Sequence, residues 1–450
     1  MKLYSSSCGI ELDFSNACAG RIGYAGGITE DDLNSVRQKA QAAHSAVEKV
    51  RAEGTLGFLK LPYTDPKLVQ EIKHLAADIE RNYSDFVVLG IGGSALGNIA
   101  VHSALNHPFY NNVPGESHPR LFVLDNVDPE YISAVMDMLP LEKTCFNVIT
   151  KSGTTAETMS QFLLFRQLII DRIGYDAFKK QVVATTDPSS GVLRKIASDE
   201  GLRTLPIPPD VGGRFSVLTA VGLLSAAVTG INISDLLEGA RLMDEECRKP
   251  EMTENPAVMN AVVQYIMDTI KMRPMAVMMP YVQSLRDFAD WFRQLLAESI
   301  GKKFDRDGNV VHVGTTPIKA LGATDQHSQI QLYMEGPEDK FITFLGVKKY
   351  RTDLTIPAAY TEIEKLSFLA NKTFSRLIHA EQQATSEALA NNGRPNCTIT
   401  LDEISAKSIG ALLYLFEYQI AIAGELYNIN AFDQPGVEEG KILTYQKMTC

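Results

Sequence analysis

The sequence is poor in cysteine and shows no cysteine and histidine spacing that would hold a metal. Its six cysteines form no C-x-x-C pair, and no histidine lies at a zinc-like distance from them along the chain. A chain of 450 residues can build its core without disulfides or a structural metal. We therefore expect reduced thiols in a cytoplasmic protein, with Cys450 at an exposed terminus, and we expect no metal site.

The sequence also lacks a hydrophobic segment suited to a membrane. The first residues, MKLYSSSCGIELDFS, contain no long apolar stretch, so we do not expect a secretory signal. The most apolar segment, residues 409–424, is too short to cross a bilayer and contains Glu417 and Gln419. We expect this segment to be a buried helix, and we expect the protein to have no membrane partner.

An excess of positive charge is absent as well. The net charge at pH 7 is −11, with 22% charged and 45% hydrophobic residues. This composition is ordinary for a globular protein, and an acidic chain does not attract nucleic acid as a whole. An anionic substrate would therefore need a local pocket lined by basic side chains or backbone amides.

Short apolar runs alternate with amphipathic segments along most of the chain, which is typical of α/β folds with a mostly parallel sheet covered by helices. Strands are expected near residues 86–91, 121–125, 146–150, 181–185, 275–279, 341–347 and 397–401. Helices are expected near residues 31–53, 65–81, 96–105, 129–139, 155–170, 216–228, 233–246 and 282–299, and a final one near 405–427. The predicted organisation is an N-terminal helical or irregular segment (1–80), a first module (81–230), a helical connection (231–272), a second module (273–430) and a polar tail carrying Lys441 (431–450).

A glycine-rich loop, GIGGSALG at residues 90–97, follows a predicted strand and opens a helix. Glycines let the backbone approach a ligand closely, and free N–H groups at a helix start can hold an anion. Gly90, Gly92 and Ala95 also fit the dinucleotide-binding fingerprint, but Asp125 lies too far along the chain to be its usual acidic partner. A tight turn without a ligand is the third interpretation.

A second polar loop, TKSGTTAET at residues 150–158, also joins a strand to a helix. Its hydroxyl groups and the N–H groups of the helix start are the donors that a phosphate monoester needs. Helix capping by Thr154 or Thr155 is compatible with that role. The loop is not a P-loop, because the pattern G-x-x-x-x-G-K-[ST] is absent.

Four further segments carry candidate groups, and the last of them carries Gln434 as well as Lys441. In VGGRFSV, two glycines present Arg214, which is either a structural arginine or a stabiliser of oxyanion charge. In QLLAESIGK, Glu298 precedes a helix break and would act as a base if a cleft desolvates it, although most helix-end glutamates are solvated. His327 in GATDQHSQ is either a proton-transfer group or an ordinary loop histidine, and Lys441 in FDQPGVEEGK is by default a surface lysine.

In this order, the segments LGIGGSALG, ITKSGTTAET, VGGRFSVLTAVGL, LLAESIGK, GATDQHSQ and FDQPGVEEGK resemble the phosphoglucose isomerase family in its shorter bacterial form. They extend from about residue 87 to residue 441, which is most of the chain. The resemblance implies two sugar-isomerase (SIS) modules, each an α/β/α sandwich around a mainly parallel sheet. It also implies reversible isomerisation of glucose 6-phosphate and fructose 6-phosphate by ring opening and C2–C1 proton transfer through an enediolate, without a cofactor.

The resemblance also assigns roles to individual residues. Arg214 would steady the intermediate, and Glu298 would be the proton-transfer base. His327 and Lys441 would open the ring, with His327 supplied by the neighbouring subunit of a homodimer. The implied substrate-binding and phosphate-binding residues are Gly93, Ser94, Thr150, Lys151, Ser152, Thr155, Gly213, Gln294 and Gln434.

Three other functions share parts of this pattern. A different SIS-type isomerase, for example one that also accepts mannose 6-phosphate, would have a similar phosphate loop and base. A non-catalytic regulator that binds sugar phosphates would lack counterparts of Glu298, His327 or Lys441, and all three are present. A nicotinamide dehydrogenase is suggested by residues 90–95 alone.

Overall fold

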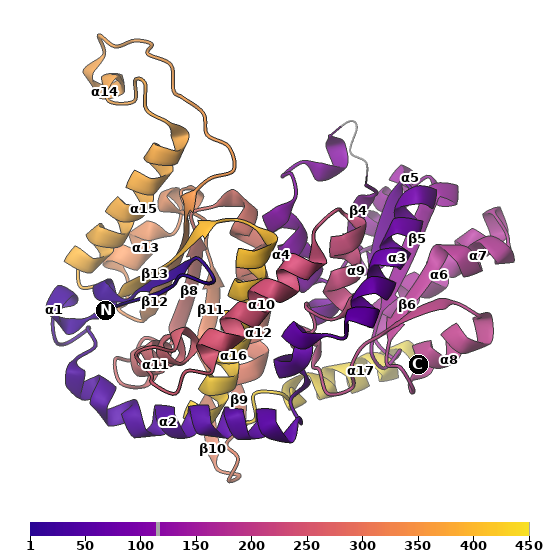
Figure 1. The fold of residues 1–450 in the computed structure, drawn as a ribbon, viewed down its shortest axis with the longest axis horizontal. Helices are drawn as coiled ribbons and strands as arrows, with labels where there is room; N and C mark the ends of the chain where they lie inside the picture. Colours follow the sequence, from indigo (N-terminus) through magenta and orange to yellow (C-terminus); the bar gives the residue numbers. More distant parts are fainter. Residues whose placement is uncertain (114–117, 450) are drawn as a thin grey trace.

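Two separate β-sheets, both flanked by helices, form the body of the protein in the computed structural model, which describes residues 1–113 and 118–449 (Figure 1). Cys450 lies outside the described residues, so its predicted exposure stays a prediction. Within each sheet, the strands at the centre run parallel. The expected α/β fold with mainly parallel sheets is therefore confirmed.

The first sheet is entirely parallel and has the strand order β4-β3-β5-β6-β7. Its strands are β3 (Asp85–Leu89), β4 (Arg120–Leu124), β5 (Thr144–Ile149), β6 (Val182–Thr186) and β7 (Arg203–Pro206). Alternate residues of a strand enter opposite cores: Val88 packs into the large central core and Val87 into a smaller one on the other face. Both faces are covered, which explains why these strands are nearly continuous apolar runs.

Helices cover both faces of the first sheet. The central-core face is covered by α3 (Pro66–Asn82), α4 (Leu96–Leu105) and α9 (Ala220–Val228), and the other face by α5 (Pro129–Met138), α6 (Ala156–Arg172), α7 (Tyr175–Gln181) and α8 (Val192–Glu200). The helix predicted from residue 216 begins only at Ala220. Residues Gly213–Phe215 form a 3-10 turn instead, and the Thr219 hydroxyl caps α9 by accepting a hydrogen bond from the Val221 amide.

The second sheet has the order β1-β2-β13-β12-β8-β11. Its strands are β1 (Lys2–Ser5), β2 (Ile10–Asp13), β8 (Met275–Pro280), β11 (Thr316–Lys319), β12 (Lys340–Lys349) and β13 (Asn396–Glu403), and a separate hairpin is formed by β9 (Lys302–Phe304) and β10 (Val310–Val313). The N-terminal strands β1 and β2 are antiparallel and extend the edge at β13. This N-terminal pair was not predicted, because we expected residues 1–80 to be helical or irregular.

The remaining helices, apart from the fully exposed α17, pack mainly around the second sheet. They are α1 (Ala19–Ile22), α2 (Glu30–Glu53), α10 (Ile233–Cys247), α11 (Pro256–Thr269), α12 (Arg286–Ile300), α13 (Ile330–Glu335), α14 (Glu364–Ser367), α15 (Phe374–Asn391), α16 (Ala406–Leu426) and α17 (Glu438–Thr449). Helix α16 is long and apolar enough to cross a membrane, but 94% of its most apolar window is buried inside the protein. The predicted buried helix is confirmed, whereas the prediction that it is the last helix is wrong, because α17 follows it.

Strands β3 and β5 end next to each other at the same edge of the first sheet. The helices that follow them, α4 and α6, lie on opposite faces of the sheet, so the loops after β3 and β5 diverge at this point. Such a switch point is where open α/β sheets bind ligands. Helix α4 also packs on α12 of the second module, where Ser103 donates a hydrogen bond to Asp287 at 2.5 Å.

Candidate active site

Arg214 lies on the short 3-10 turn Gly213–Phe215, and only 3% of the residue is exposed. The turn packs directly against the loop that follows β3. A Cβ atom on Gly93 would lie 2.2 Å from the carbonyl group of Gly213, so no other residue fits without moving the backbone. The missing side chain of Gly93 thus lets the two loops touch, and the contact holds Arg214 beside the glycine-rich loop.

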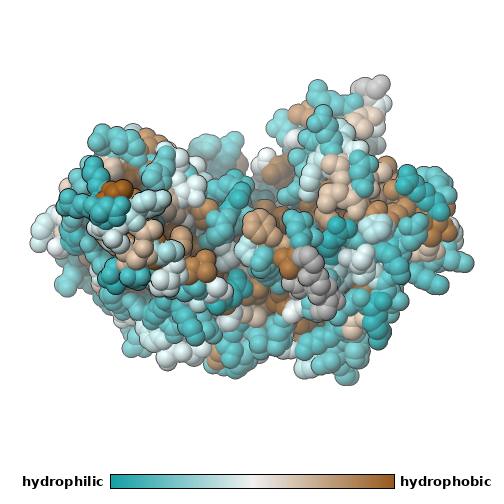
Figure 2. Space-filling view, turned by 90° about the horizontal axis from the view of Figure 1, so that it is seen from above, coloured by the Kyte–Doolittle hydropathy of each residue, from teal (hydrophilic) through white to brown (hydrophobic). Residues whose placement is uncertain are grey.

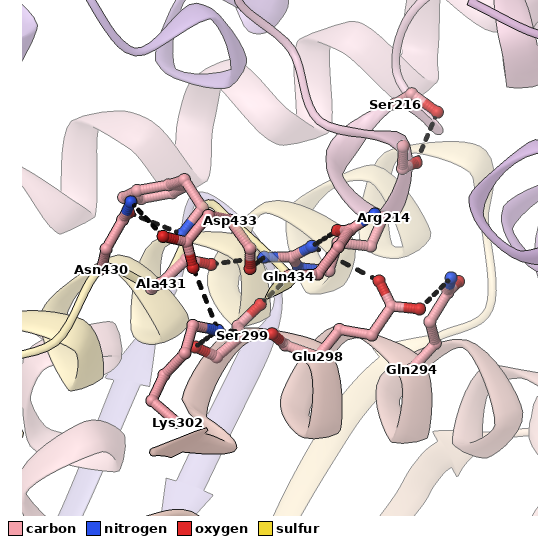
Figure 3. A network of polar contacts seen from close by, with 12 residues as sticks. Arg214, Ser216, Gln294, Glu298, Ser299, Lys302, Asn430, Ala431, Asp433 and Gln434 are labelled. Carbon is pink, nitrogen blue, oxygen red and sulfur yellow. Dashed lines mark hydrogen bonds and ion pairs between the residues drawn. The ribbon is translucent and has the colours of Figure 1, made fainter. Parts of the chain in front are cut away.

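Three groups fix the inner side of the Arg214 guanidinium (Figure 3). Its Nε donates to the Ser299 hydroxyl at 2.7 Å. Its Nη2 donates to the carbonyl of Ala431 at 2.6 Å and to that of Asp433 at 3.2 Å. Burial lowers the pKa of Arg214, and the nearby carboxylates of Glu298 and Asp433 oppose that shift. An arginine keeps its charge throughout the neutral pH range, so a fixed cation lies at this position.

The outer nitrogen of the guanidinium, Nη1, meets two side chains. It donates to Glu298 Oε2 at 3.3 Å and also to the side-chain oxygen of Gln434. The second oxygen of Glu298 accepts a hydrogen bond from Gln294, one helical turn earlier on α12, at 3.0 Å. The Glu298 side chain is 32% exposed, so solvent reaches the carboxylate and it is not enclosed as we expected for a desolvated base. Four residues that the sequence singled out therefore form one connected network.

The loop after β5 presents several hydroxyl groups beside the start of α6. Thr150 Oγ1 lies 3.1 Å from Thr155 Oγ1, and Ser152 Oγ lies 2.8 Å from Thr154 Oγ1. Thr155 is the N-cap residue of α6 but its side chain makes no capping hydrogen bond. The Thr155 hydroxyl is therefore not used to cap the helix, and the loop keeps the donors that an anion would need.

Two contacts link this loop and the glycine-rich loop to the rest of the network. Lys151 Nζ donates to the carbonyls of Pro209 at 2.9 Å and Val211 at 3.2 Å, just before the turn that carries Arg214. On the other side, a Cβ atom on Gly92 would come within 2.9 Å of the Gln294 amide nitrogen. The first turn after β3, which contains Ser94, thus lies against the helix that carries Glu298.

His327 and Lys441 are not part of the network. His327 ends a 3-10 turn (η8, Thr324–His327), its side chain is exposed, and within residues 1–113 and 118–449 no group hydrogen-bonds its imidazole. The turn is anchored by its neighbour Gln326, which donates to the Tyr281 hydroxyl at 2.9 Å. Lys441 lies on the exposed helix α17 and pairs with Glu438, with 61% of its side chain exposed.

Ala431 and three polar residues of the network were not singled out in the sequence. Ser299, Lys302 and Asp433 contact Arg214 or the end of α12, and Figure 3 shows them between Arg214 and the helix end. All three lie inside the segments LLAESIGK and FDQPGVEEGK that carry the family resemblance. Their position in those segments was therefore the sequence feature that could have identified them as candidate site residues.

Surface cavities elsewhere in the protein do not include this network. One of about 380 Å³ lies over β2, β13 and α15, and one of about 400 Å³ lies between α4 and the start of α12. Neither is lined by Arg214 or Glu298. The network is therefore distinguished by its convergent polar groups and not by the size of a cavity.

Comparisons with known proteins give a consistent result. A family model described as phosphoglucose isomerase matches residues 73–449. A glucose-6-phosphate isomerase of Carboxydothermus hydrogenoformans is 48% identical over 420 residues, which are 93% of this chain and 90% of that protein. A glucose-6-phosphate isomerase of Methanocaldococcus jannaschii is 38% identical over 437 residues, which are 97% of this chain and 99% of that protein.

Two solved structures resemble the whole chain. A hypothetical protein from Thermus thermophilus is 36% identical, with a TM-score of 0.87 over 98% of this chain and 100% of that one. A glucose-6-phosphate isomerase from Chlamydia trachomatis is 22% identical, with a TM-score of 0.83 over 100% of this chain and 89% of that one. At that level of identity, the second likeness concerns the fold alone.

Proposed function

The chain belongs to the phosphoglucose isomerase family and interconverts glucose 6-phosphate and fructose 6-phosphate, and we propose that it does so at the network around Arg214 and Glu298. The observation that carries this proposal is the contact of 3.3 Å between Arg214 Nη1 and Glu298 Oε2, which joins residues 84 positions apart. A proton-transfer base and a cation for an oxyanion are the two groups that isomerisation through an enediolate requires.

The phosphate group of the substrate binds, in this proposal, to the hydroxyl-rich loop after β5. Thr150, Ser152 and Thr155 supply hydroxyl groups, and the N-terminus of the 17-residue helix α6 supplies free amides. Because the phosphate is remote from the reacting carbons, its binding energy positions the sugar without entering the chemistry. The glycine loop with Gly93 and Ser94 lies at the adjacent strand end and lines the space between phosphate and base.

Glu298 removes the proton from C2 and returns it to C1. Its Oε1 accepts from Gln294 and its Oε2 from Arg214, so each oxygen of the carboxylate has a partner before substrate arrives. The enediolate then carries negative charge on oxygen, and a donor aimed at such charge contributes about 3 to 4 kcal/mol of barrier reduction.

Arg214 Nη1 is the donor that meets the enediolate. The nitrogens Nε and Nη2 are held by the buried Ser299 hydroxyl and by backbone carbonyls, which cannot turn away. The contacts of Nη1 are to the side chains of Glu298 and Gln434, which can rotate. Substrate binding therefore exchanges one or both of these side-chain contacts for a substrate oxygen.

His327, the proposed ring-opening group, comes from the partner of a homodimer. Within one chain its turn is anchored at Tyr281, between β8 and α12, whereas Glu298 lies near the opposite end of α12. The ion pair between Lys319 and Asp290, at 2.7 Å, places the end of β11 beside the second turn of the helix. The eight residues from there to Glu298 span about 12 Å along the helix, and this separation supports the proposal that His327 serves the site of the partner subunit.

Exposed apolar side chains support the proposal of a homodimer. The excursion between β12 and α15 projects from the body with α14 at its tip (Figure 1), and Leu354, Tyr360 and Phe368 on it are each more than 60% exposed. On α17, Tyr445 is 72% and Met448 83% exposed. Figure 2 shows that the face seen from above is mostly hydrophilic, with hydrophobic side chains in separate patches. Apolar groups concentrated on projecting segments are typical of contact surfaces.

Lys441 joins the site only if α17 changes its position or packs against a partner. Every described residue of α17 is exposed, so no packing in the single chain fixes the helix. Gln434, which precedes α17, is already bonded to Arg214 and ties the start of this segment to the site. We also propose a cytoplasmic location, which is supported by five unpaired cysteines among the described residues.

A direct assay tests the proposed function. The purified protein should convert fructose 6-phosphate to glucose 6-phosphate with and without a metal chelator, and inorganic phosphate should compete with the substrate. Mannose 6-phosphate, supplied in the same coupled assay, shows whether the site also accepts the C2 epimer. Absence of turnover in the folded protein would overturn the proposal.

A further inference from the structure

Lys302 is a buried lysine directly behind the proposed base. It follows Gly301 at the end of α12, and only 6% of its side chain is exposed. Its Nζ donates to the carbonyls of Glu298 at 2.7 Å and Ser299 at 2.9 Å. These are terminal carbonyls of α12, which have no partner within the helix. The ammonium group therefore fixes the backbone of the two residues that contact Arg214.

The same ammonium group reaches the segment that follows α16. Lys302 Nζ lies 3.7 Å from Asp433 Oδ1, and the other oxygen of Asp433 accepts a hydrogen bond from Asn430 at 2.8 Å. The backbone carbonyl of Asp433 is one of the acceptors for Arg214 Nη2. Lys302 thus connects the helix that carries Glu298 to the loop that holds Arg214, as Figure 3 shows.

A helix cap alone does not explain this arrangement. Lysine side chains are rarely buried, because the ammonium group loses its hydration, and an exposed lysine can interact with a helix C-terminus equally well. Lys302 also lies close enough to the Arg214 cation to be repelled by it, and burial, together with this repulsion, lowers its pKa, although the carboxylates of Asp433 and Glu298 oppose that shift. A buried cation beside a second cation is an arrangement that stability alone does not favour.

We propose that Lys302 is a positioning residue that sets the distance between Glu298 and Arg214 by holding the end of α12 and, through Asp433, the loop of residues 430–434. This role rests on the proposed function of the two residues that it aligns. Lys302 itself contacts no substrate in this proposal. Its contribution is geometric, and a displacement of about 1 Å between catalytic groups can cost about 100-fold in rate.

Lys302→Met tests the role, with Lys303→Met as the matched control. Lys303 is the neighbouring lysine, but it is exposed and lies over the Phe304 ring at 5.0 Å. We expect Lys302→Met to lower kcat for fructose 6-phosphate about 100-fold, with KM and the inhibition constant of inorganic phosphate changed less than about threefold. Lys303→Met should leave all three values unchanged. A kcat of Lys302→Met within about threefold of wild type would overturn the proposal.

Asp433→Asn is a second variant, and it should fold normally because half of the Asp433 side chain is exposed and asparagine has nearly the same size. We expect it to lower kcat about tenfold without a change in KM, and we expect the double variant Lys302→Met/Asp433→Asn to be no slower than Lys302→Met. Additive losses in kcat would show that the two residues act separately and would overturn the proposed link. Two further measurements test the proposed function separately: wild type should turn over fructose 6-phosphate, and Glu298→Gln should not. If both hold, a negative result for Lys302→Met overturns only the positioning role.

Discussion

The inner and outer halves of the proposed active site are built in opposite ways. In the inner half, Arg214 is buried, and each of its guanidinium nitrogens has an acceptor within the chain. In the outer half, His327 and Lys441 are exposed and lie outside that network. Packing of one chain therefore brings together the groups that we propose for proton transfer and charge stabilisation, whereas the ring-opening role that we propose for His327 and Lys441 requires a partner chain or a movement of α17.

Removal of the proposed base should have the largest effect. Glu298→Gln keeps the hydrogen bond to Gln294 but cannot take a proton, so kcat should fall by about 1,000-fold or more while inorganic phosphate still binds. The matched control is Glu335→Gln on α13, which also accepts from a glutamine one turn earlier, Gln331, and precedes a glycine. The measurement is steady-state turnover of fructose 6-phosphate, and an unchanged kcat would contradict the assignment of the base.

Replacement of the fixed cation should have the next largest effect. Arg214→Lys keeps one positive charge but cannot satisfy Ser299, the backbone carbonyls of residues 431 and 433, and Glu298 together. We expect kcat to fall about 100- to 1,000-fold, with a smaller change in KM. Single-turnover kinetics with saturating substrate check this, and a loss that is confined to KM would show that Arg214 acts in binding only.

Loss of the imidazole tests the outer half. His327→Ala should lower turnover of the cyclic sugar by about 100-fold and affect proton exchange with an open-chain substrate much less. The control is His107→Ala, another exposed loop histidine. Equal losses on the cyclic and open-chain substrates would argue against a ring-opening role.

Mixed dimers sharpen the contrast between the two halves. A heterodimer of His327→Ala and Glu298→Gln subunits should recover activity, because one of its two sites then combines an intact imidazole with an intact carboxylate. Purification through two different affinity tags, one on each subunit, verifies the heterodimer, and the recovered rate is compared with that of each parent. No recovery in a verified heterodimer would place His327 and Glu298 in the same subunit's site.

A substitution in the core should have the smallest effect on the reaction. Glu417 on α16 is fully buried, its carboxylate oxygens have no hydrogen-bond partner in the described part of the chain, and burial raises its pKa well above the usual 4.5. The folded protein therefore keeps this proton while the unfolded chain releases it above about pH 4.5, so stability decreases as the pH rises through that range. Glu417→Gln removes this penalty.

The expected result for Glu417→Gln is a gain in Tm of a few degrees at pH 8 and little gain at pH 4, with kcat and KM unchanged. Thermal unfolding at the two pH values measures the difference. The same gain at both pH values would show that Glu417 does not hold a proton in the folded state. A change in kcat would show that the packing around α16 affects the geometry of the proposed active site.

Local pattern predicted the elements well where one periodicity extends over a whole segment. The apolar run that ends in the glycine loop predicted β3, and the apolar segment around Glu417 predicted the buried helix α16. The errors lie where a segment is short or lacks an apolar face. Strands β1 and β2 are short, and they form because β2 pairs with β13, which lies far along the chain. Helix α17 has no buried residue, so its sequence lacks the apolar periodicity from which a helix is predicted.

By itself, the sequence determined the parallel α/β architecture, the family and the identity of the candidate groups, because periodicity and short motifs are properties of neighbouring residues. Only the tertiary structure decided which nitrogen of Arg214 faces Glu298, that Lys302 is buried behind them, and that His327 is exposed on a turn anchored at Tyr281. These facts depend on how residues far apart in sequence pack together. Pairings of that kind are set by the three-dimensional arrangement of helices and loops, which no local pattern specifies.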